Sequence, residues 1–255
     1  MFHDENNIAK VARHLSESKQ AIAFTGAGIS TESGIPDFRS PGGVWTKYQP
    51  VYFQDFLASE DARRRYWQMK REGYHEMKDA KPNEGHMALA RLEGAGKVVA
   101  VITQNIDGLH QQAGSRRVLE LHGTSRHCLC LKCGERFEAD EIQERLESGL
   151  EIPLCDKCGG FIKSATISFG QAMPVDVLTE AFDLCLETDM MLAIGSSLVV
   201  EPAASIPLQA KQNGARLVII NRDETPLDSM ADAVIRTPIG TSLLEVTRQL
   251  SLNNG

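Results

Sequence analysis

The chain has 255 residues, of which 42% are apolar and 24% are charged, so it can form one large domain or a large and a small one. Its net charge of −7 argues against a nucleic-acid partner, because phosphate binding usually needs a basic face. The sequence shows neither a signal-like N-terminus nor an apolar run near the roughly 20 residues of a membrane span. We therefore expect a cytoplasmic protein without a membrane partner.

Short apolar runs alternate with helical patterns along the chain. An amphipathic helix is expected at 4–18, followed by a buried strand at 21–25. Further buried strands are predicted at 97–103, 189–195, 216–221 and 231–235, and further helices at 83–93, 174–188, 203–213 and 240–250. Continuous apolar strands that alternate with helices indicate a parallel sheet covered on both faces. The expected fold is therefore α/β, a doubly wound, Rossmann-like sheet.

Two segments interrupt this alternation. We assign residues 1–37, 86–124 and 165–255 to the Rossmann-like domain. The segments 38–85, which is rich in aromatic and charged residues, and 125–164, which carries paired cysteines, are expected to form a smaller inserted lobe. The first would be a helical cofactor-loop module and the second a zinc-ribbon module.

Two cysteine pairs share the pattern C-x-K-C-G, at Cys130 and Cys133 and at Cys155 and Cys158, with 21 residues between the pairs. Four thiolates at this spacing suit a closed tetrahedral zinc site, about 2.3 Å from each sulfur. With no open position left for water, the zinc is expected to be structural. Cys128 is a possible substitute ligand but lies outside the repeated pattern.

A glycine-rich turn follows the first strand, at Gly26 and Gly28. Glycines there can bring backbone N–H groups close to a pyrophosphate, although an ordinary strand-to-helix turn explains the pattern equally well. Dehydrogenases carry a third glycine where this chain has Thr31, and an acidic residue about 20 positions further on, which is missing here. A hydride-transferring enzyme therefore fits poorly.

The chain closely resembles the sirtuin family over roughly residues 8–250. The stretch GAGISTESGIPDFR (26–39) is similar to the family's cofactor-binding loop, and TQNIDGLH (103–110) to its nicotinamide-pocket motif. The segment LHG (121–123) lies where the family keeps a catalytic histidine, and GSSL (195–198) and IN (220–221) match two later strand ends that contact NAD. The resemblance implies an NAD-dependent protein-lysine deacylase.

The resemblance also implies roles for individual residues. His122 would be the general base, and Asn105 would assist catalysis by placing a water and contacting the nicotinamide ribose. Asp107 would accept a hydrogen bond from the nicotinamide amide, although it could merely cap a helix. Phe38 would shield the reacting face from water, or simply belong to the core. The full set of implied NAD contacts is Gly26, Ala27, Gly28, Thr31, Phe38, Arg39, Gln104, Asn105, Ile106, Asp107, His122, Gly195, Ser196, Ser197, Asn221, Arg222, Asp223 and Thr241.

For the acyl-lysine peptide, the resemblance implies strand-like pairing with two segments. The first segment holds Ile167, Phe169 and Gly170, and the second is 198–201, with Leu198 and Val199 as the expected contacts. The chain departs from the family at Gln171, where Glu is usual, and at residues 164–165, Ser-Ala, where Arg-Pro is common. These departures concern the peptide-binding rim and leave the substrate sequence preference open.

Two alternatives to protein deacetylation remain at this point. One is mono-ADP-ribosyl transfer to proteins, and the other is removal of longer acyl chains. A neutral acyl group is expected, because a buried carboxylate needs a fixed cationic partner. The branch of the resembled family that removes carboxylate-ended groups carries a Tyr-x-x-Arg pair on this helix, whereas here Tyr66 is followed three residues later by Met69. Lys70 and Arg71 could still reach the acyl chain and pair with a carboxylate, or both could simply be solvated on the helix face. We expect a monomer or weak oligomer.

Overall fold

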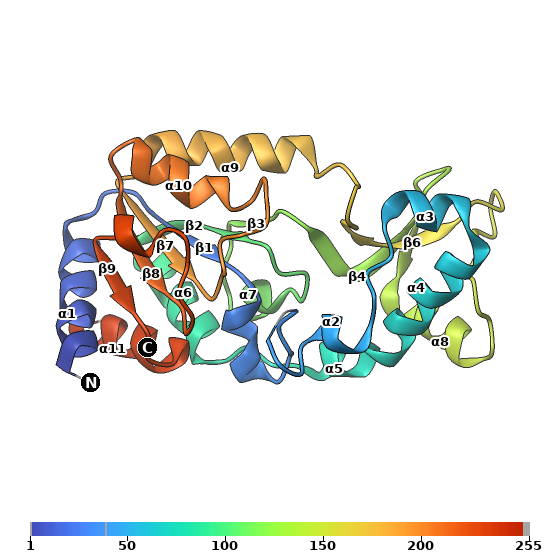
Figure 1. Ribbon diagram of the computed structural model, residues 1–255, viewed down its shortest axis with the longest axis horizontal. Helices are drawn as coiled ribbons and strands as arrows, with labels where there is room; N and C mark the ends of the chain where they lie inside the picture. The colour runs from blue at the N-terminus through green and yellow to red at the C-terminus, as the bar shows by residue number, and fades with distance from the viewer. Residues whose placement is uncertain (1, 39, 252–255) are drawn as a thin grey trace.

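A six-stranded parallel sheet organises the larger lobe in the computed structural model, which describes residues 2–38 and 40–251 (Figure 1). The strand order is β3-β2-β1-β7-β8-β9. The strands are β1 (Ala21–Thr25), β2 (Val98–Thr103), β3 (Val118–Glu120), β7 (Met190–Ile194), β8 (Arg216–Ile220) and β9 (Ala233–Ile235). Their connections reverse direction between β1 and β7, which is where open parallel sheets usually bind ligands.

Helices cover both faces of this sheet, so its strands are buried on both sides. One face packs against α1 (Phe2–Glu17), α6 (Glu84–Gly94) and α11 (Ile239–Gln249). The other packs against α9 (Val175–Glu187) and α10 (Ser205–Gln212). All five residues of β1 are buried; Ala21 and Ala23 join the first core, and Ile22 and Phe24 the second.

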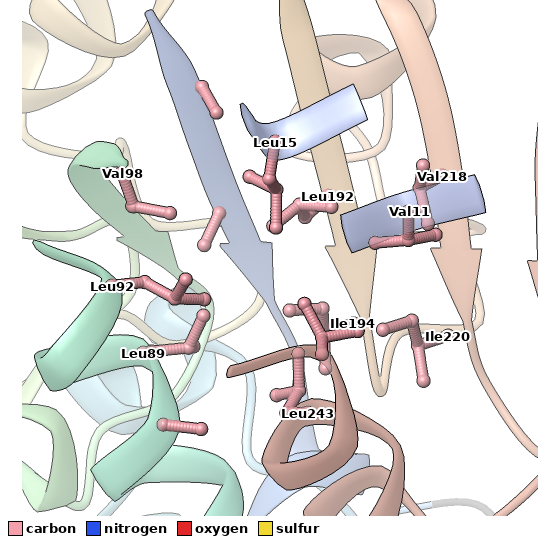
Figure 2. Packing of buried hydrophobic residues seen from close by; sticks show 14 of the residues in the cluster. Val11, Leu15, Leu89, Leu92, Val98, Leu192, Ile194, Val218, Ile220 and Leu243 are labelled. Carbon is pink, nitrogen blue, oxygen red and sulfur yellow. The ribbon is translucent and has the colours of Figure 1, made fainter. Parts of the chain in front are cut away.

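The first of these cores consists of buried apolar side chains from the sheet and three helices. The helices contribute Val11 and Leu15 from α1, Leu89 from α6 and Leu243 from α11 (Figure 2). These side chains belong to one cluster with the sheet residues Leu192, Ile194 and Val218. Each of these side chains is fully buried. Burying an aliphatic side chain of this size contributes about 1.5–3 kcal/mol. The core therefore holds rigid the strand ends from which the site is built.

A smaller lobe lies at the other end of the molecule (Figure 1). Its antiparallel sheet has the order β5-β4-β6, formed by β4 (Gly123–Cys130), β5 (Arg136–Glu138) and β6 (Ile162–Thr166). The apolar core of this lobe includes residues of β4 and β6 and of three helices, α3 (Phe53–Ala58), α4 (Glu60–Glu72) and α8 (Ala139–Glu147). The remaining elements are η1 (Ala27–Ser33), α2 (Val44–Lys47), α5 (Tyr74–Asp79), α7 (Leu109–Gln112) and η2 (Asp228–Met230).

The predicted fold class is confirmed, with some differences in detail. The five expected strands and the helices between them are present, each within a few residues of its expected bounds. The short edge strand β3 adds a sixth strand to the sheet. Within the described ranges, no helix combines the length and the apolar character that a membrane span needs.

Candidate active site and zinc centre

One cavity of about 1120 Å³ extends from the carboxyl ends of the sheet strands into the small lobe. Of the predicted NAD contacts, those that line it are Gly26, Ala27, Gly28, Thr31, Phe38, Gln104, Asn105, Ile106, Asp107, His122, Gly195, Ser196, Ser197, Asn221, Arg222 and Asp223. Of the predicted peptide contacts, Ile167, Phe169 and Gly170 line it. Thr241, Leu198 and Val199 are not among the lining residues, whereas Val200 and Glu201 are. Arg39 lies outside the described residues.

The glycine turn after β1 is shaped by a second loop that crosses it. The N–H groups of Gly26 and Gly28 donate to Ile194 O and Gly195 O, at 3.0 and 2.8 Å. A Cβ atom on Gly28 would lie 2.7 Å from Gly195 Cα, and Gly195 itself has a φ of 61°. These glycines therefore let the loops after β1 and β7 touch. Their N–H groups are already engaged within the protein, in contrast to the phosphate-cradle interpretation of the sequence.

The segment after β2 forms a buried hydrogen-bonded network with the cofactor loop. Ser30 Oγ donates to Asp107 Oδ2 at 2.8 Å and accepts from Asn105 Nδ2 at 3.0 Å. Asp107 Oδ1 also accepts from Leu109 N at 2.8 Å, so this carboxylate caps α7 as well as lining the cavity. Gln104 Nε2 donates to Ser196 Oγ at 2.8 Å and links the segment to the loop after β7. Ser30 was not among the predicted site residues.

His122 lies at the junction of β3 and β4, half-buried against the cavity. Its Nδ1 is 3.0 Å from the carbonyl oxygen of Gln104. Because a carbonyl only accepts, Nδ1 must carry the hydrogen, and the neutral ring then presents Nε2 as its basic atom. Burial lowers the pKa of His122 below its usual value, which keeps the ring neutral near pH 7. The arrangement suits a general base.

Two residues of β4 hydrogen-bond to the segment that follows β2, residues 104–108. Ser125 donates twice to Ile106 O, from N at 2.9 Å and from Oγ at 2.7 Å. Arg126 Nη2 donates to Gly108 O at 2.6 Å, and its guanidinium lies where a Cβ on Gly108 would be. Neither residue lies in a sequence motif that indicates this role, because these contacts depend on how β4 folds back on the loop.

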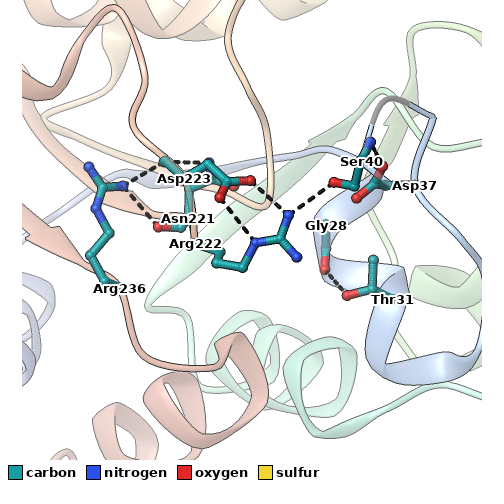
Figure 3. A network of polar contacts seen from close by, with 8 residues as sticks. All are labelled: Gly28, Thr31, Asp37, Ser40, Asn221, Arg222, Asp223 and Arg236. Atoms are coloured by element: carbon teal, nitrogen blue, oxygen red, sulfur yellow. Dashed lines mark hydrogen bonds and ion pairs between the residues drawn. The ribbon is translucent and has the colours of Figure 1, made fainter. Parts of the chain in front are cut away.

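A polar network closes the cavity at the far end of β8 (Figure 3). Arg222 Nη2 donates to Ser40 Oγ at 3.0 Å and to Asp223 at 2.8 Å, so it bridges two loops. Arg236 Nη1 donates to the carbonyl oxygens of Asn221 and Asp223, at 2.8 Å each. Arg236 therefore fixes the backbone at Asn221 and Asp223, and no sequence motif had indicated this role.

Three aromatic side chains, Phe38, Trp45 and Phe169, line one part of the cavity wall. The ring centroid of Trp45 lies 5.4 Å from that of Phe38 and 6.0 Å from that of Phe169, and Tyr52 lies 5.8 Å from Phe169. Phe38 therefore belongs to a ring cluster at the cavity wall and not to the sheet core. Gln171 Oε1 accepts from Ser168 N at 3.1 Å and closes the turn that carries Phe169.

The four predicted zinc ligands come together at the tip of the small lobe. Their sulfur atoms lie within 4.8 Å of one another, with Cys130 and Cys158 at 3.5 Å and Cys133 and Cys155 at 3.7 Å. A tetrahedron of sulfurs about 2.3 Å from zinc has edges of about 3.8 Å, so the cluster suits zinc. Cys128 is outside the cluster.

Comparison with known proteins agrees with this geometry. Residues 26–202 match the model of the Sir2 family. An NAD-dependent protein deacetylase of Rhodopseudomonas palustris is 47% identical over 240 residues, covering 93% of this chain and 95% of the relative. A structure of Sir2 with a p53 peptide and NAD+ superimposes with a TM-score of 0.88 at 40% identity, covering 96% of this chain and 98% of that one.

A structure of Sir2 bound to an acetylated peptide is also similar, with a TM-score of 0.88 at 37% identity, covering 96% of this chain and 99% of that one. The similarity therefore spans both lobes, the cavity between them and the cysteine cluster. The chain belongs to the Sir2 family.

Proposed function

We propose that this protein is an NAD-dependent protein-lysine deacetylase. In the reaction, acetyl-lysine, NAD and water give lysine, nicotinamide and O-acetyl-ADP-ribose. The observation that carries the proposal is the neutral, half-buried His122, which faces the same cavity as the network of Asn105 and Asp107. The name of the Rhodopseudomonas relative and the peptide and NAD complexes of Sir2 support it.

The residues of the cavity suit the three parts of NAD. Asp107 and Ile106 would hold the nicotinamide carboxamide, with Gln104 and Asn105 on the adjoining ribose. Ser196, Ser197 and Asn221 would hold the adenosine side, close to the network of Figure 3. Bound NAD supplies the ribose carbon that accepts the acyl oxygen, and His122 Nε2 then takes a proton from a ribose hydroxyl. Phe38 and its ring cluster would keep water from that carbon.

The lysine-bearing peptide is proposed to enter beside Ile167. Ile167 N donates to His122 O at 2.8 Å, which ties the peptide-binding segment to the base. Two cavity-lining residues, Phe169 and Gly170, continue this segment, and of the predicted segment 198–201 the residues Val200 and Glu201 line the same cavity. The zinc ion would hold the small lobe in shape without touching the reaction.

The remaining expectations are also part of the proposal. We assign residues 1–37, 86–124 and 165–255 to the NAD-binding domain and 38–85 and 125–164 to the small lobe. The protein would be a cytoplasmic enzyme that acts on proteins, as a monomer or weak oligomer without a membrane partner. Its acidic net charge of −7 supports the absence of a nucleic-acid partner.

Mass spectrometry of an acetyl-lysine peptide, incubated with and without NAD, tests the proposal. Deacetylation that requires NAD and yields O-acetyl-ADP-ribose is the expected result. Covalent ADP-ribose on an acceptor protein, with the acetyl group retained, would instead support the alternative of mono-ADP-ribosyl transfer.

A further inference from the structure

One ammonium group is buried inside the small lobe and is not part of the cavity lining. Lys163 of β6 is 1% exposed, and its Nζ lies 5.5 Å from the ring centroid of Tyr66 on α4. Within the described residues, the charged or titratable groups that act on Lys163 are Lys70 and Cys128, and neither is a carboxylate. A buried charge without a carboxylate partner is unfavourable for folding, which favours a functional role for this lysine.

The hydrogen bonds of Lys163 go to the backbone just before the proposed peptide-binding segment. Its Nζ donates to Ser164 O at 3.4 Å and, over a shorter distance, to Thr166 O. Thr166 O belongs to the same peptide group as Ile167 N, which donates to His122 O at 2.8 Å. This one peptide group is therefore held at its oxygen by the buried ammonium group and at its nitrogen by the backbone of the proposed base.

The pairing of β4 and β6 is irregular at this point. Their register shifts after Gly123, so that residues 124–127 of β4 lie opposite the single residue Ala165 of β6. These extra residues of β4 include the two that hydrogen-bond to the segment after β2. An ammonium group carries three donors and can bind carbonyl groups where the regular ladder of backbone hydrogen bonds is interrupted. Lys163 therefore supports β6 at the place where β4 turns toward the NAD side of the cavity.

The charge of Lys163 depends on pH near neutrality. Burial, together with the like charge of Lys70, lowers the pKa of Lys163 to about 7. Lys70 is half-buried and lines the cavity, and burial lowers its pKa to about 8. Tyr66 and Cys128 stay neutral in this range, because burial raises the pKa of both. A neutral amine is a weaker donor than an ammonium group, so the bond from Lys163 to Thr166 O weakens as the pH rises.

We propose that Lys163 is a positioning residue for the lysine-bearing substrate: by holding the peptide group of Thr166 and Ile167, its ammonium group fixes the Ile167 backbone with which the substrate pairs. The inference rests on the proposed function. Lys163 does not line the cavity, so it acts through Ile167 and through the hydrogen bond from Ile167 N to His122 O. Loss of the ammonium group therefore weakens binding of the acyl-lysine peptide and leaves NAD binding intact, because the proposed NAD contacts lie on the loops of the larger lobe.

Binding of a fluorescent acetyl-lysine peptide to the whole protein, measured by polarisation without NAD, tests this role, with calorimetric titration of NAD as the second readout. Lys163→Met keeps most of the side-chain volume and removes its donors. We expect it to weaken peptide binding about tenfold, the usual effect of a lost charge-assisted hydrogen bond, and to leave NAD binding unchanged. In turnover, the loss should appear in the KM for the peptide more than in kcat.

Two further variants complete this test. Lys163→Arg keeps the positive charge and the donors, and should bind the peptide within about threefold of the wild type. Lys81→Met is the matched control, because Lys81 is exposed and outside the cavity lining, and it should change neither affinity. Unchanged peptide binding in Lys163→Met, or an equal loss of peptide and NAD binding, would overturn the proposal.

The pH dependence of peptide binding decides the question if Lys163→Met does not fold. Between about pH 6 and 9, the wild type should lose affinity for a peptide without titratable groups by about threefold or more, whereas Lys163→Arg stays charged and should not show this loss. Lys70 titrates in both proteins, so the difference between the two curves belongs to Lys163. Curves of the same shape would contradict the proposal. Intact peptide binding by a wild-type protein that does not deacetylate would count instead against the proposed function.

Discussion

At the scale of single residues, the account depends most on His122. Its Nδ1 hydrogen bond to Gln104 O leaves Nε2 as the base, and loss of a positioned base typically lowers a rate by a factor of about 10²–10⁴. We expect His122→Ala to lose deacetylation by such a factor while still binding NAD, as measured by steady-state kinetics and by calorimetric titration of NAD. In the wild type, kcat/KM should fall on the acid side through a pKa below the usual value near 6.5. A variant that deacetylates at the wild-type rate would remove His122 from the mechanism.

Two other histidines should make stability depend on pH. Burial lowers the pKa of His86 to about 4 and that of His110 to about 3, and His110 Nε2 lies 2.9 Å from Thr25 Oγ1. Below pH 6.5 the unfolded chain protonates these rings and the folded protein does not, so stability falls as the pH drops from about 6.5 to 4. Each histidine should contribute roughly 1.4 kcal/mol per pH unit in that window.

Urea unfolding between pH 7 and pH 5, with zinc present throughout, measures this dependence. In the variant His110→Asn, the free energy of unfolding should change less steeply with pH than in the wild type. The difference in slope should be roughly 1.4 kcal/mol per pH unit, the contribution of one histidine. Identical slopes in the two proteins would show that His110 protonates as easily in the folded protein as in the unfolded chain.

At the scale of elements, strand β4 holds the segment after β2 in place. Arg126 donates to Gly108 O, and Ser125 donates to Ile106 O, on the two sides of Asp107. Removing the guanidinium in Arg126→Ala should loosen the pocket and weaken inhibition by nicotinamide about tenfold, the size of a lost charge-assisted hydrogen bond. Arg136→Ala is the control, because that side chain is exposed and pairs with Glu138 on β5. Equal nicotinamide inhibition in the two variants would show that β4 does not support this segment.

The cysteine cluster couples zinc to the folding of the small lobe. Cys133→Ala leaves three thiolates, and binding of structural zinc is part of the folding free energy. We expect the variant to hold less zinc, to melt at a lower temperature and to lose activity, as measured by metal analysis and thermal unfolding. Cys128→Ser serves as the comparison, because Cys128 lies outside the cluster and should leave the zinc content unchanged. A stable and fully active Cys133→Ala protein without zinc would contradict the structural role.

At the scale of the whole molecule, the sequence predicted the features that local patterns encode. Buried strands such as 21–25 and the two cysteine knuckles have short-range signals, and both were located correctly. The edge strand β3 has only three residues, too few for a clear hydrophobic period. Lys70 lines the cavity, whereas the helical pattern of α4 alone left open whether its side chain would reach inward or be solvated.

Several residues that support the site could not be predicted in this way, although Ser30 lies within the cofactor-loop motif. Ser30, Arg126 and Arg236 act through partners 77, 18 and 15 positions away along the chain, and only the folded backbone brings them together. The predicted contact Thr241 had an ambiguous register in the sequence, and the cavity is lined instead by the preceding residues Pro238 and Ile239. Long motifs thus indicated the location of the site, and tertiary structure was needed for the residues that support it.

The most direct test of the central claim is the stoichiometry of products in a single time course with wild-type protein, acetyl-lysine peptide and NAD. If the two substrates meet in the one cavity between the lobes, nicotinamide, deacetylated peptide and O-acetyl-ADP-ribose should appear in equal amounts throughout. Release of nicotinamide without an equal loss of acetyl groups, or deacetylation in the absence of NAD, would contradict the account.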